Sequence, residues 1–228
     1  MKIVAISDLH GFCPTIIEKF DILLICGDVC PVWNHSREYQ WNWLNDDFIN
    51  WVNNLPFKDV FSRVIMIAGN HDFIFENFPS YEKREWLSKL NNRVVYLDNE
   101  EYIFNDGEKD YRIFGTPYCK VFGNWAFMRE NLNKYFDAIP EGLDFLISHD
   151  APMIDNYGII REGRWTGENA GNKPLADAIN RAKPKYAFHG HIHSSNHEMK
   201  EIDGTNIACV SIMNEKYEPL YLPLILNV

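Results

Sequence analysis

The chain has 228 residues, a formal net charge of −10 and 46% hydrophobic residues. A chain of this length can bury a sizeable core without disulfides, and we expect a single domain over residues 1–228. The acidic balance argues against a protein that coats DNA or RNA, because neutralising a phosphate backbone requires a basic surface. It does not exclude a small phosphorylated substrate, since bound metal ions can reverse the local charge of a pocket.

The cysteines and the apolar segments indicate in which cellular compartment the protein is expected. The five cysteines are scattered along the chain, and such an odd set is typical of reduced thiols in a reducing compartment. No apolar stretch approaches the roughly 20 residues that a membrane-spanning helix needs, and no signal-peptide pattern opens the chain. We therefore expect a cytoplasmic protein without a membrane partner.

The first third of the chain predicts alternating strands and helices. Two runs rich in Ile, Ile3–Ile6 and Ile22–Ile25, are bounded by turn formers and predict strands that are buried on both faces. Across Trp41–Leu55, apolar side chains recur every three or four residues, which predicts an amphipathic helix that Pro56 ends. We interpret its three tryptophans as core packing. Val64–Ala68 predicts the next strand.

The remaining two thirds continue this alternation and add two hairpin regions. Asp106-Gly107 is a turn signal within residues 94–114, and Asp203-Gly204 is a similar signal within residues 198–224. The other predicted elements are helices at about Tyr81–Leu90 and Lys173–Ala182 and strands at Phe145–Ile147 and Tyr186–Phe188. Together they predict an α/β fold, a four-layer α/β/β/α sandwich of two mixed β-sheets flanked by helices.

Polar side chains follow every one of the five buried runs. In α/β proteins the carboxyl ends of strands are where ligand sites assemble, so these side chains are expected to converge. Their ordered recurrence after apolar runs is far beyond what composition alone would produce. The segments are Ser7-Asp8-Leu9-His10-Gly11, Cys26-Gly27-Asp28, Gly69-Asn70-His71-Asp72, Ser148-His149-Asp150 and His189-Gly190-His191-Ile192-His193.

This ordered set of motifs resembles the calcineurin-like metallophosphoesterase family, and it extends from residue 8 to residue 193. Further segments, among them Phe114-Gly115-Thr116-Pro117 and Trp125-Ala126-Phe127, are similar to the metallophosphoesterase-domain-containing (MPPED-like) branch. The resemblance implies a centre of two divalent metal ions. It assigns Asp8, His10 and His193 to one ion, Asn70, His149 and His191 to the other, and Asp28 to both as a bridge.

The resemblance also implies roles for residues that act on the substrate. His71 is the motif histidine that does not bind metal and acts on the substrate, and we expect Asp72 to orient its ring. Asn70 is expected to bind substrate as well as metal. Apart from the resemblance, Arg161 and Arg164 lie in a Gly-rich stretch, Gly158–Gly171, that is expected to cover the site and bring them to the phosphate, with a solvated loop as the alternative.

The remaining histidines are expected to be structural, because a lone histidine is more often a satisfied core or surface residue than a ligand. These are His35, His189 and His197. The cysteines are interpreted in the same way, since thiolate ligands would duplicate a complete set.

The ligand chemistry indicates which ions the site prefers. Imidazole and carboxylate together suit Mn, Fe or Zn rather than an all-oxygen calcium site, and Mn is the expected ion. Two ions about 3.5–4 Å apart need a shared anionic ligand, which Asp28 can supply. The resemblance then implies that a metal-bridging hydroxide attacks phosphorus. We therefore expect a hydrolase for small phosphoesters.

Phosphodiesters, nucleotides and cyclic nucleotides among them, are the preferred substrates. After Gly27-Asp28 the chain continues as Val29-Cys30-Pro31, without the Asp and Arg residues of the family's phosphoprotein phosphatases. The alternatives are a phosphomonoesterase and a non-catalytic interaction module on the same fold. A nuclease for long DNA is opposed by the acidic charge. The oligomeric state is open.

Overall fold

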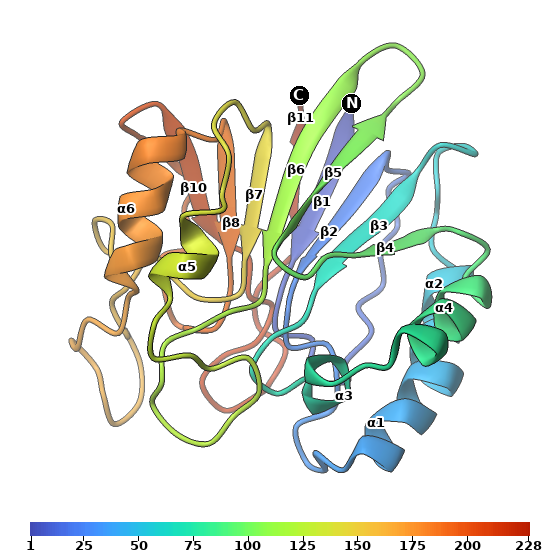
Figure 1. Ribbon diagram of the computed structural model, residues 1–228, viewed down its shortest axis with the longest axis horizontal. Coiled ribbons are helices and arrows are strands. Elements are labelled where there is room, and N and C mark those ends of the chain that lie inside the picture. Colours follow the sequence, from blue (N-terminus) through green and yellow to red (C-terminus); the bar gives the residue numbers. More distant parts are fainter.

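Two mixed β-sheets lie at the centre of the protein, which a computed structural model describes over residues 1–228 (Figure 1). The first sheet contains β1 (Lys2–Ile6), β2 (Ile22–Cys26), β3 (Arg63–Ile67), β4 (Val94–Tyr96) and β11 (Leu224–Asn227). Strands β1 to β4 are parallel neighbours in chain order, and β11 pairs antiparallel with β1 at the other edge.

The second sheet has six strands and a parallel centre. It contains β5 (Glu100–Asn105), β6 (Asp110–Thr116), β7 (Phe145–Ser148), β8 (Tyr186–His189), β9 (Lys200–Ile202) and β10 (Thr205–Cys209). The spatial order is β5-β6-β7-β8-β10-β9, and only the edge strands β5 and β9 are antiparallel to their neighbours. The hairpins β5–β6 and β9–β10 turn at Asp106-Gly107 and Asp203-Gly204, as predicted.

The helices flank the two sheets. The predicted helix at 41–55 begins earlier, because the side chain of Ser36 caps it by accepting a hydrogen bond from the backbone N–H of Tyr39. It runs through α1 (Arg37–Trp43), a π-helical turn η1 (Leu44–Phe48) and α2 (Ile49–Asn53). The other helices are α3 (Phe73–Glu76), α4 (Ser80–Ser88), α5 (Asn133–Phe136) and α6 (Lys173–Ala182). None of them has the length and apolar character that crossing a bilayer requires.

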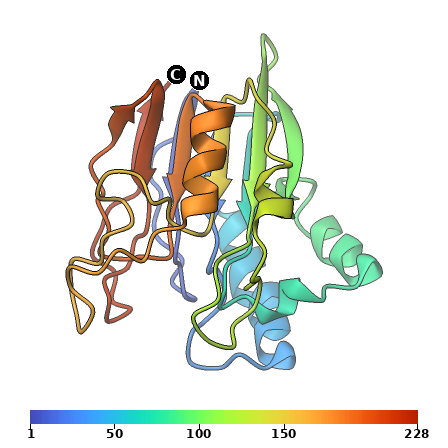
Figure 2. The same cartoon turned by 60° about the vertical axis from the view of Figure 1, so that its left-hand side comes forward.

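Three layers of hydrophobic side chains hold the four structural layers together. Because side chains alternate along a strand, Ile3 and Ala5 of β1 face the second sheet while Val4 and Ile6 face α1, α2 and α4. On the opposite side, α6 packs Leu175 and other apolar residues against the outer face of the second sheet, and Figure 2 shows α6 in front of that sheet. The predicted α/β/β/α sandwich is confirmed.

The C-terminal segment departs from the sequence-based expectation. Residues 198–224 were expected to form one hairpin region, but only β9 and β10 do so, and they belong to the second sheet. The chain then crosses to the first sheet, where β11 pairs with β1 from Lys2↔Asn227 to Ala5↔Leu224. Both termini therefore lie beside each other at the upper edge in Figure 1, and the carboxyl ends of the parallel strands lie at the opposite edge.

Candidate functional site

The predicted ligand residues gather where the parallel strands of both sheets end. Residues following β1, β2 and β3 come from the first sheet, and residues following β7 and β8 come from the second. Six of the side chains are buried, namely Asp8, His10, Asp28, Asn70, His149 and His193, and His191 is partly buried. Few forces other than ligand binding would bring so many polar groups into a buried site.

One group of ligand atoms comes from Asp8, His10 and His193, and they lie within 4.8 Å of one another. The Nε2 atoms of the two histidines are 3.2 Å apart, and Nε2 of His193 is 3.4 Å from Oδ1 of Asp8. Two ligands that each bind one cation at about 2.1 Å lie roughly 3.0–3.4 Å from each other. The Nδ1 atom of His193 contacts the carbonyl of Asn214 at 2.9 Å, which leaves Nε2 free to bind metal.

A second group surrounds His149. Its Nδ1 lies 3.0 Å from the carbonyl oxygen of Cys26 and can donate to it, so that Nε2 of the neutral ring carries a lone pair. This Nε2 faces Oδ1 of Asn70 at 2.9 Å and Oδ2 of Asp28 at 3.4 Å. The same Oδ2 atom is 3.7 Å from Nε2 of His10 in the first group. Asp28 therefore lies between the two groups, as a bridging carboxylate would.

Asp8 departs from the family assignment, which gives it to one ion alone. The ring of His191 packs edge-on against that of His149, with centroids 5.0 Å apart, and its backbone N–H donates to Oδ1 of Asp8 at 3.1 Å. Asp8 lies within 4.8 Å of ligand atoms of Asp28 and His149 as well as of its own group. The structure thus places Asp8 near both groups and His191 beside the second.

The electrostatics of the site favour a cation between the carboxylates. Burial by itself would raise the pKa of Asp8 and Asp28, but His193 and His149 respectively hold these pKa values well below the usual range. Burial opposes charge on His149 as well, yet Asp28 raises its pKa to about 10, and Asp8 likewise raises the pKa of His193 to about 9. Protons on these imidazoles supply the positive charge beside the carboxylates that bound metal ions would otherwise supply.

The backbone of the site is strained, and two of its positions have room only for glycine. Asp8, His10, Asp28 and His191 all have left-handed conformations, with φ between 45° and 68°, each costing on the order of 1–3 kcal/mol. A Cβ on Gly69 would collide with the carboxylate of Asp28, and one on Gly190 would collide with Ser7 and Asp8. The glycines of both motifs are therefore required by the close approach of ligand residues.

Asp72 does not have the role that the sequence suggested. Its buried carboxylate accepts hydrogen bonds from the backbone N–H groups of Val29 at 3.0 Å and of Cys30 and Gly69 at 2.8 Å. It therefore joins the loop that carries Asp28 to the loop that carries Asn70, and the expectation that it orients the ring of His71 is wrong. That ring contacts His35, which we had expected to be structural, through Nδ1 and Nε2 atoms 3.0 Å apart.

A cavity of about 470 Å³ opens beside the ligand residues, within the range of small-molecule sites. His71 lies on its wall together with Asp28, Asn70, His191 and His193. Four aromatic residues and one cationic residue, Lys120, also line the cavity. The aromatic residues are Phe122, Trp125, Trp165 and Tyr217, and Trp125 packs against His71 with ring centroids 4.5 Å apart. Trp125 belongs to a segment that the sequence singled out by resemblance, but no local pattern predicted a place at the site for it, for the other three aromatic residues or for Lys120.

Arg161 and Arg164 do not line this cavity. Both are exposed: the backbone N–H of Arg161 donates to Oγ of Ser194, and the guanidinium of Arg164 lies over the ring of Trp165. The loop at 158–171 instead contributes Ile160, Trp165 and Ala170 to the cavity. The loop thus borders the cavity, but its arginines are not among the residues that line it.

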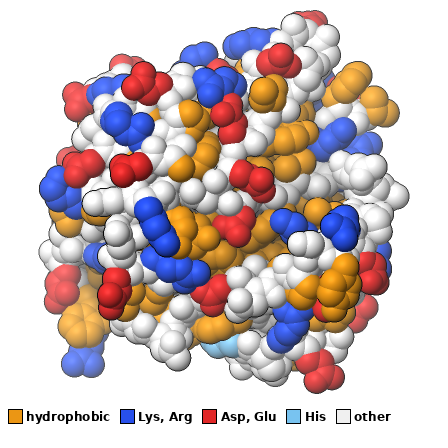
Figure 3. Space-filling view, viewed as in Figure 1, with side chains coloured by type: hydrophobic (Ala, Val, Ile, Leu, Met, Phe, Trp, Pro, Cys, Tyr) orange, Lys and Arg blue, Asp and Glu red, His pale blue; other side chains and the backbone are white.

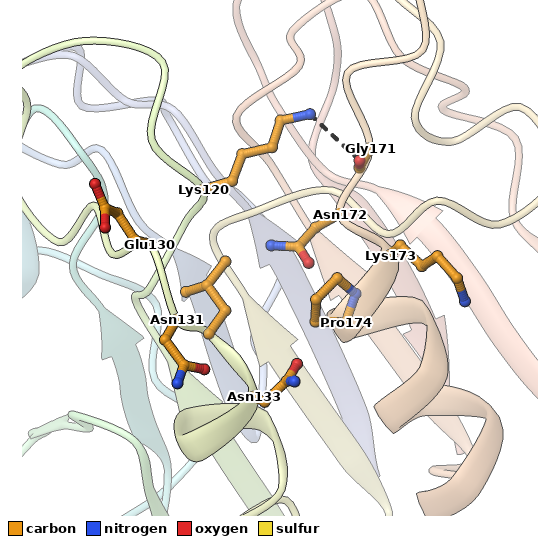
Figure 4. Close-up of a pocket in the computed structure, with 9 residues that line it drawn as sticks. Lys120, Glu130, Asn131, Asn133, Gly171, Asn172, Lys173 and Pro174 are labelled. Carbon is orange, nitrogen blue, oxygen red and sulfur yellow. Dashed lines mark hydrogen bonds between the residues drawn. The ribbon is translucent and has the colours of Figure 1, made fainter.

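Lys120 also borders a second hollow of about 540 Å³ at the start of α6 (Figure 4). Its ammonium donates to the carbonyl of Gly171 at 3.3 Å, which is the dashed line in Figure 4. None of the predicted ligand residues lines this hollow. On the face shown in Figure 3, basic and acidic side chains are interspersed, and histidine surface is visible only at the lower edge. This face has no basic stripe for nucleic acid.

Comparisons with known proteins agree with this geometry. Residues 1–195 match the family model for calcineurin-like phosphoesterases. Metallophosphoesterase domain-containing protein 1 of Homo sapiens is 26% identical to this chain, over 100% of this chain and 71% of that protein. Phosphopantetheinyl Hydrolase from Mycobacterium tuberculosis has a similar fold, with a TM-score of 0.53 at 14% identity over 92% of this chain and 89% of that one. A second solved structure, TT1561 of Thermus thermophilus, gives a TM-score of 0.54 at 10% identity, over 91% and 88%.

Proposed function

Because this chain belongs to the calcineurin-like phosphoesterase family, we propose that it is a two-metal phosphodiesterase for small substrates, nucleotide-like and cyclic diesters included. One observation carries the proposal: two groups of ligand atoms share Asp28 and open onto a cavity that four aromatic residues help to line. The acidic net charge of −10 favours such small substrates over long nucleic acid.

The donor set fits two divalent cations. Asp8, His10 and His193 would hold one, with Mn as the first choice and Fe or Zn as alternatives. Asn70, His149 and His191 would hold the other, and Asp28 would lie between them. When bound, the ions supply positive charge for the phosphoryl oxygens and a nucleophile derived from water.

Three further groups of the cavity would act on the substrate directly. His71 lies on the cavity wall and can donate a hydrogen bond to the oxygen that leaves phosphorus. The ammonium of Lys120 can bind a phosphoryl oxygen. Trp125 and Tyr217 offer ring faces on which a planar group such as a nucleobase can stack. A cavity of about 470 Å³ leaves room for both ester groups of a diester.

The direct test compares two model substrates on protein that has been stripped of metal and then supplied with Mn. We expect bis(p-nitrophenyl) phosphate to be hydrolysed with a higher kcat/KM than mono(p-nitrophenyl) phosphate, and Asp28→Asn to lose both activities. A strong preference for the monoester would contradict the diesterase assignment. A panel of linear and cyclic nucleotides under the same conditions would then identify the substrate class.

A further inference from the structure

The ring of His71 is held by a second histidine that lies outside the ligand set. Nε2 of His35 is 3.0 Å from Nδ1 of His71, and the ring centroids are 5.1 Å apart. Trp125 contacts both rings, with centroid distances of 4.5 Å to His71 and 5.3 Å to His35. Phe73 packs against His35 at 5.2 Å. The two imidazoles therefore have little freedom to rotate.

The start of α1 holds the main chain of His71 as well as its ring. Gln40 is fully buried, and its Nε2 donates to the carbonyl of His71 at 2.7 Å. Oε1 of the same side chain accepts from the backbone N–H of Ile74 at 2.9 Å. His35 lies one residue before Ser36, the residue that caps α1. A single short segment thus fixes His71 at two points, at its ring and at its carbonyl oxygen.

A contact between two imidazole nitrogens has consequences for the tautomer. At 3.0 Å, the facing nitrogens of His35 and His71 must share one hydrogen, because two N–H groups or two lone pairs at this distance would repel each other. A neutral imidazole has one N–H and one lone pair, and one of the two facing nitrogens must donate. When Nε2 of His35 donates, Nδ1 of His71 accepts, and the hydrogen of His71 is confined to its own Nε2.

We propose that His35 is a positioning residue for His71, and that its Nε2–H···Nδ1 hydrogen bond keeps His71 in the tautomer whose Nε2–H serves the leaving-group oxygen. This inference rests on the proposed function, in which His71 stabilises the negative charge that develops on that oxygen. His71 acts as a hydrogen-bond donor, and no proton is transferred from it. Fixing a donor in the geometry that the transition state needs is an established source of rate enhancement.

The first test uses two substitutions of His35, one that keeps a hydrogen-bond donor and one that has no polar atom. His35→Gln places an amide N–H near the position of Nε2, and His35→Leu has no donor. On aryl methyl phosphodiesters of increasing leaving-group basicity, we expect His35→Leu to lower kcat by about 10–100-fold for basic leaving groups. The expected loss is small for p-nitrophenolate, KM changes little, and His35→Gln recovers most of kcat. Equal losses across the series, or a Gln variant no better than Leu, would overturn the proposal.

Two controls separate positioning from damage to the fold. Tyr39→Phe removes a hydroxyl that accepts a hydrogen bond from Trp33 at the exposed start of α1, and it should leave kcat unchanged. In a His71→Ala background, His35→Leu should cause no further loss of activity. An additive further loss would show that His35 acts independently of His71, and the proposal would fail.

The second readout requires no activity. Long-range ¹H–¹⁵N spectra of the metal-free protein should show His71 as the Nε2–H tautomer in the wild type and in His35→Gln. In the wild type, an Nδ1–H tautomer would overturn the proposal, even if His35→Leu does not fold. A wild-type protein that hydrolyses no phosphodiester would instead contradict the proposed function. If the wild type is active and His35→Leu retains full activity on every ester, only the role of His35 is wrong.

Discussion

Nε2 of His149 faces Oδ1 of Asn70 at 2.9 Å, while Nδ1 of the same ring is bonded to the carbonyl of Cys26. In a neutral ring this arrangement points a lone pair at an amide oxygen, which is repulsive unless a cation lies between them or the ring is protonated. The raised pKa of His149, about 10, shows that the pocket recruits a proton when no metal is bound. Binding of a metal ion between these two atoms therefore stabilises the folded protein.

Metal removal should therefore lower the thermal stability of the protein. At a free metal concentration 100 times Kd, binding stabilises the native state by about 2.7 kcal/mol. For a domain of this size, that corresponds to roughly 5–10 °C in Tm. Differential scanning fluorimetry with and without chelator measures the shift. Asn70→Leu should show a clearly smaller shift, and an Mn-independent Tm in the wild type would contradict a metal site.

Metal binding should also release protons. The pKa values of His149 and His193 are raised to about 10 and about 9 by Asp28 and Asp8, against the opposing effect of burial. Both rings are thus protonated at pH 7.5 in the metal-free protein, and both must be neutral to bind metal. We expect about two protons to be released per protein molecule at pH 7.5. Calorimetric titration with Mn in buffers of different ionisation enthalpy measures this number.

The proton release and the apparent metal affinity should both depend on pH, in a direction that the raised pKa values determine. A raised pKa stabilises the metal-free fold fully below the unfolded value of 6.5, and this contribution is lost as pH rises through about 9–10. Because protons compete with the metal for the same imidazole nitrogens, the apparent metal affinity should rise between pH 6.5 and pH 10. Above that range both rings are already neutral, and the proton release should fall towards zero. His193→Asn should release one proton fewer than the wild type. A release that does not depend on pH would refute the assignment.

The elements that the sequence predicted are those with a strong local period. The buried runs of β1, β2 and β3 and the stripe of α6 carry their pattern within a few residues, and α6 has the predicted bounds Lys173–Ala182. The pairing of β11 with β1 joins residues more than 200 positions apart. No local pattern specifies such a partner, so the last strand was not assigned to the first sheet.

In the candidate site too, residues in local sequence motifs were predicted, whereas residues that reach the site through long-range contacts were not. Ligand residues were recognised because each follows a buried strand in a short motif. His35 and Lys120 were not, because each lies outside the motifs and reaches the cavity or His71 only through the tertiary fold. Asp72 was misjudged because its neighbour in sequence is His71, whereas its carboxylate points to the backbone of Val29 and Cys30.

Asp72→Ala should destabilise the protein rather than alter the chemistry selectively. The substitution leaves the N–H groups of Val29, Cys30 and Gly69 without their acceptor in a buried environment. We expect a loss of about 3–5 kcal/mol in the free energy of unfolding, together with weaker metal binding. Urea denaturation of the metal-free protein measures the first effect. Asp177→Ala, which removes an exposed ion pair with Lys173, should stay within about 0.5 kcal/mol.

Lys120, rather than the arginines of the 158–171 loop, should determine how tightly the substrate binds. Lys120 lines the cavity beside the ligand residues, whereas Arg164 does not line it and its guanidinium lies over Trp165. Lys120→Met should raise KM for a phosphodiester about 10-fold with a smaller change in kcat, because a charge-assisted hydrogen bond is worth about 1.5–3 kcal/mol. Lys120→Arg should retain most of the affinity.

Arg164→Met is the matched control, and steady-state kinetics on bis(p-nitrophenyl) phosphate provides the measurement. Lys120 also tethers Gly171 through its ammonium, so a displaced loop could mimic a lost substrate contact. The two effects separate with inorganic phosphate as a competitive inhibitor: loss of a phosphate contact raises its inhibition constant in parallel with KM, whereas loop displacement alone leaves that constant unchanged. If Arg164→Met raises KM as much as Lys120→Met does, the loop closes over the substrate through its arginine, and the original expectation is correct.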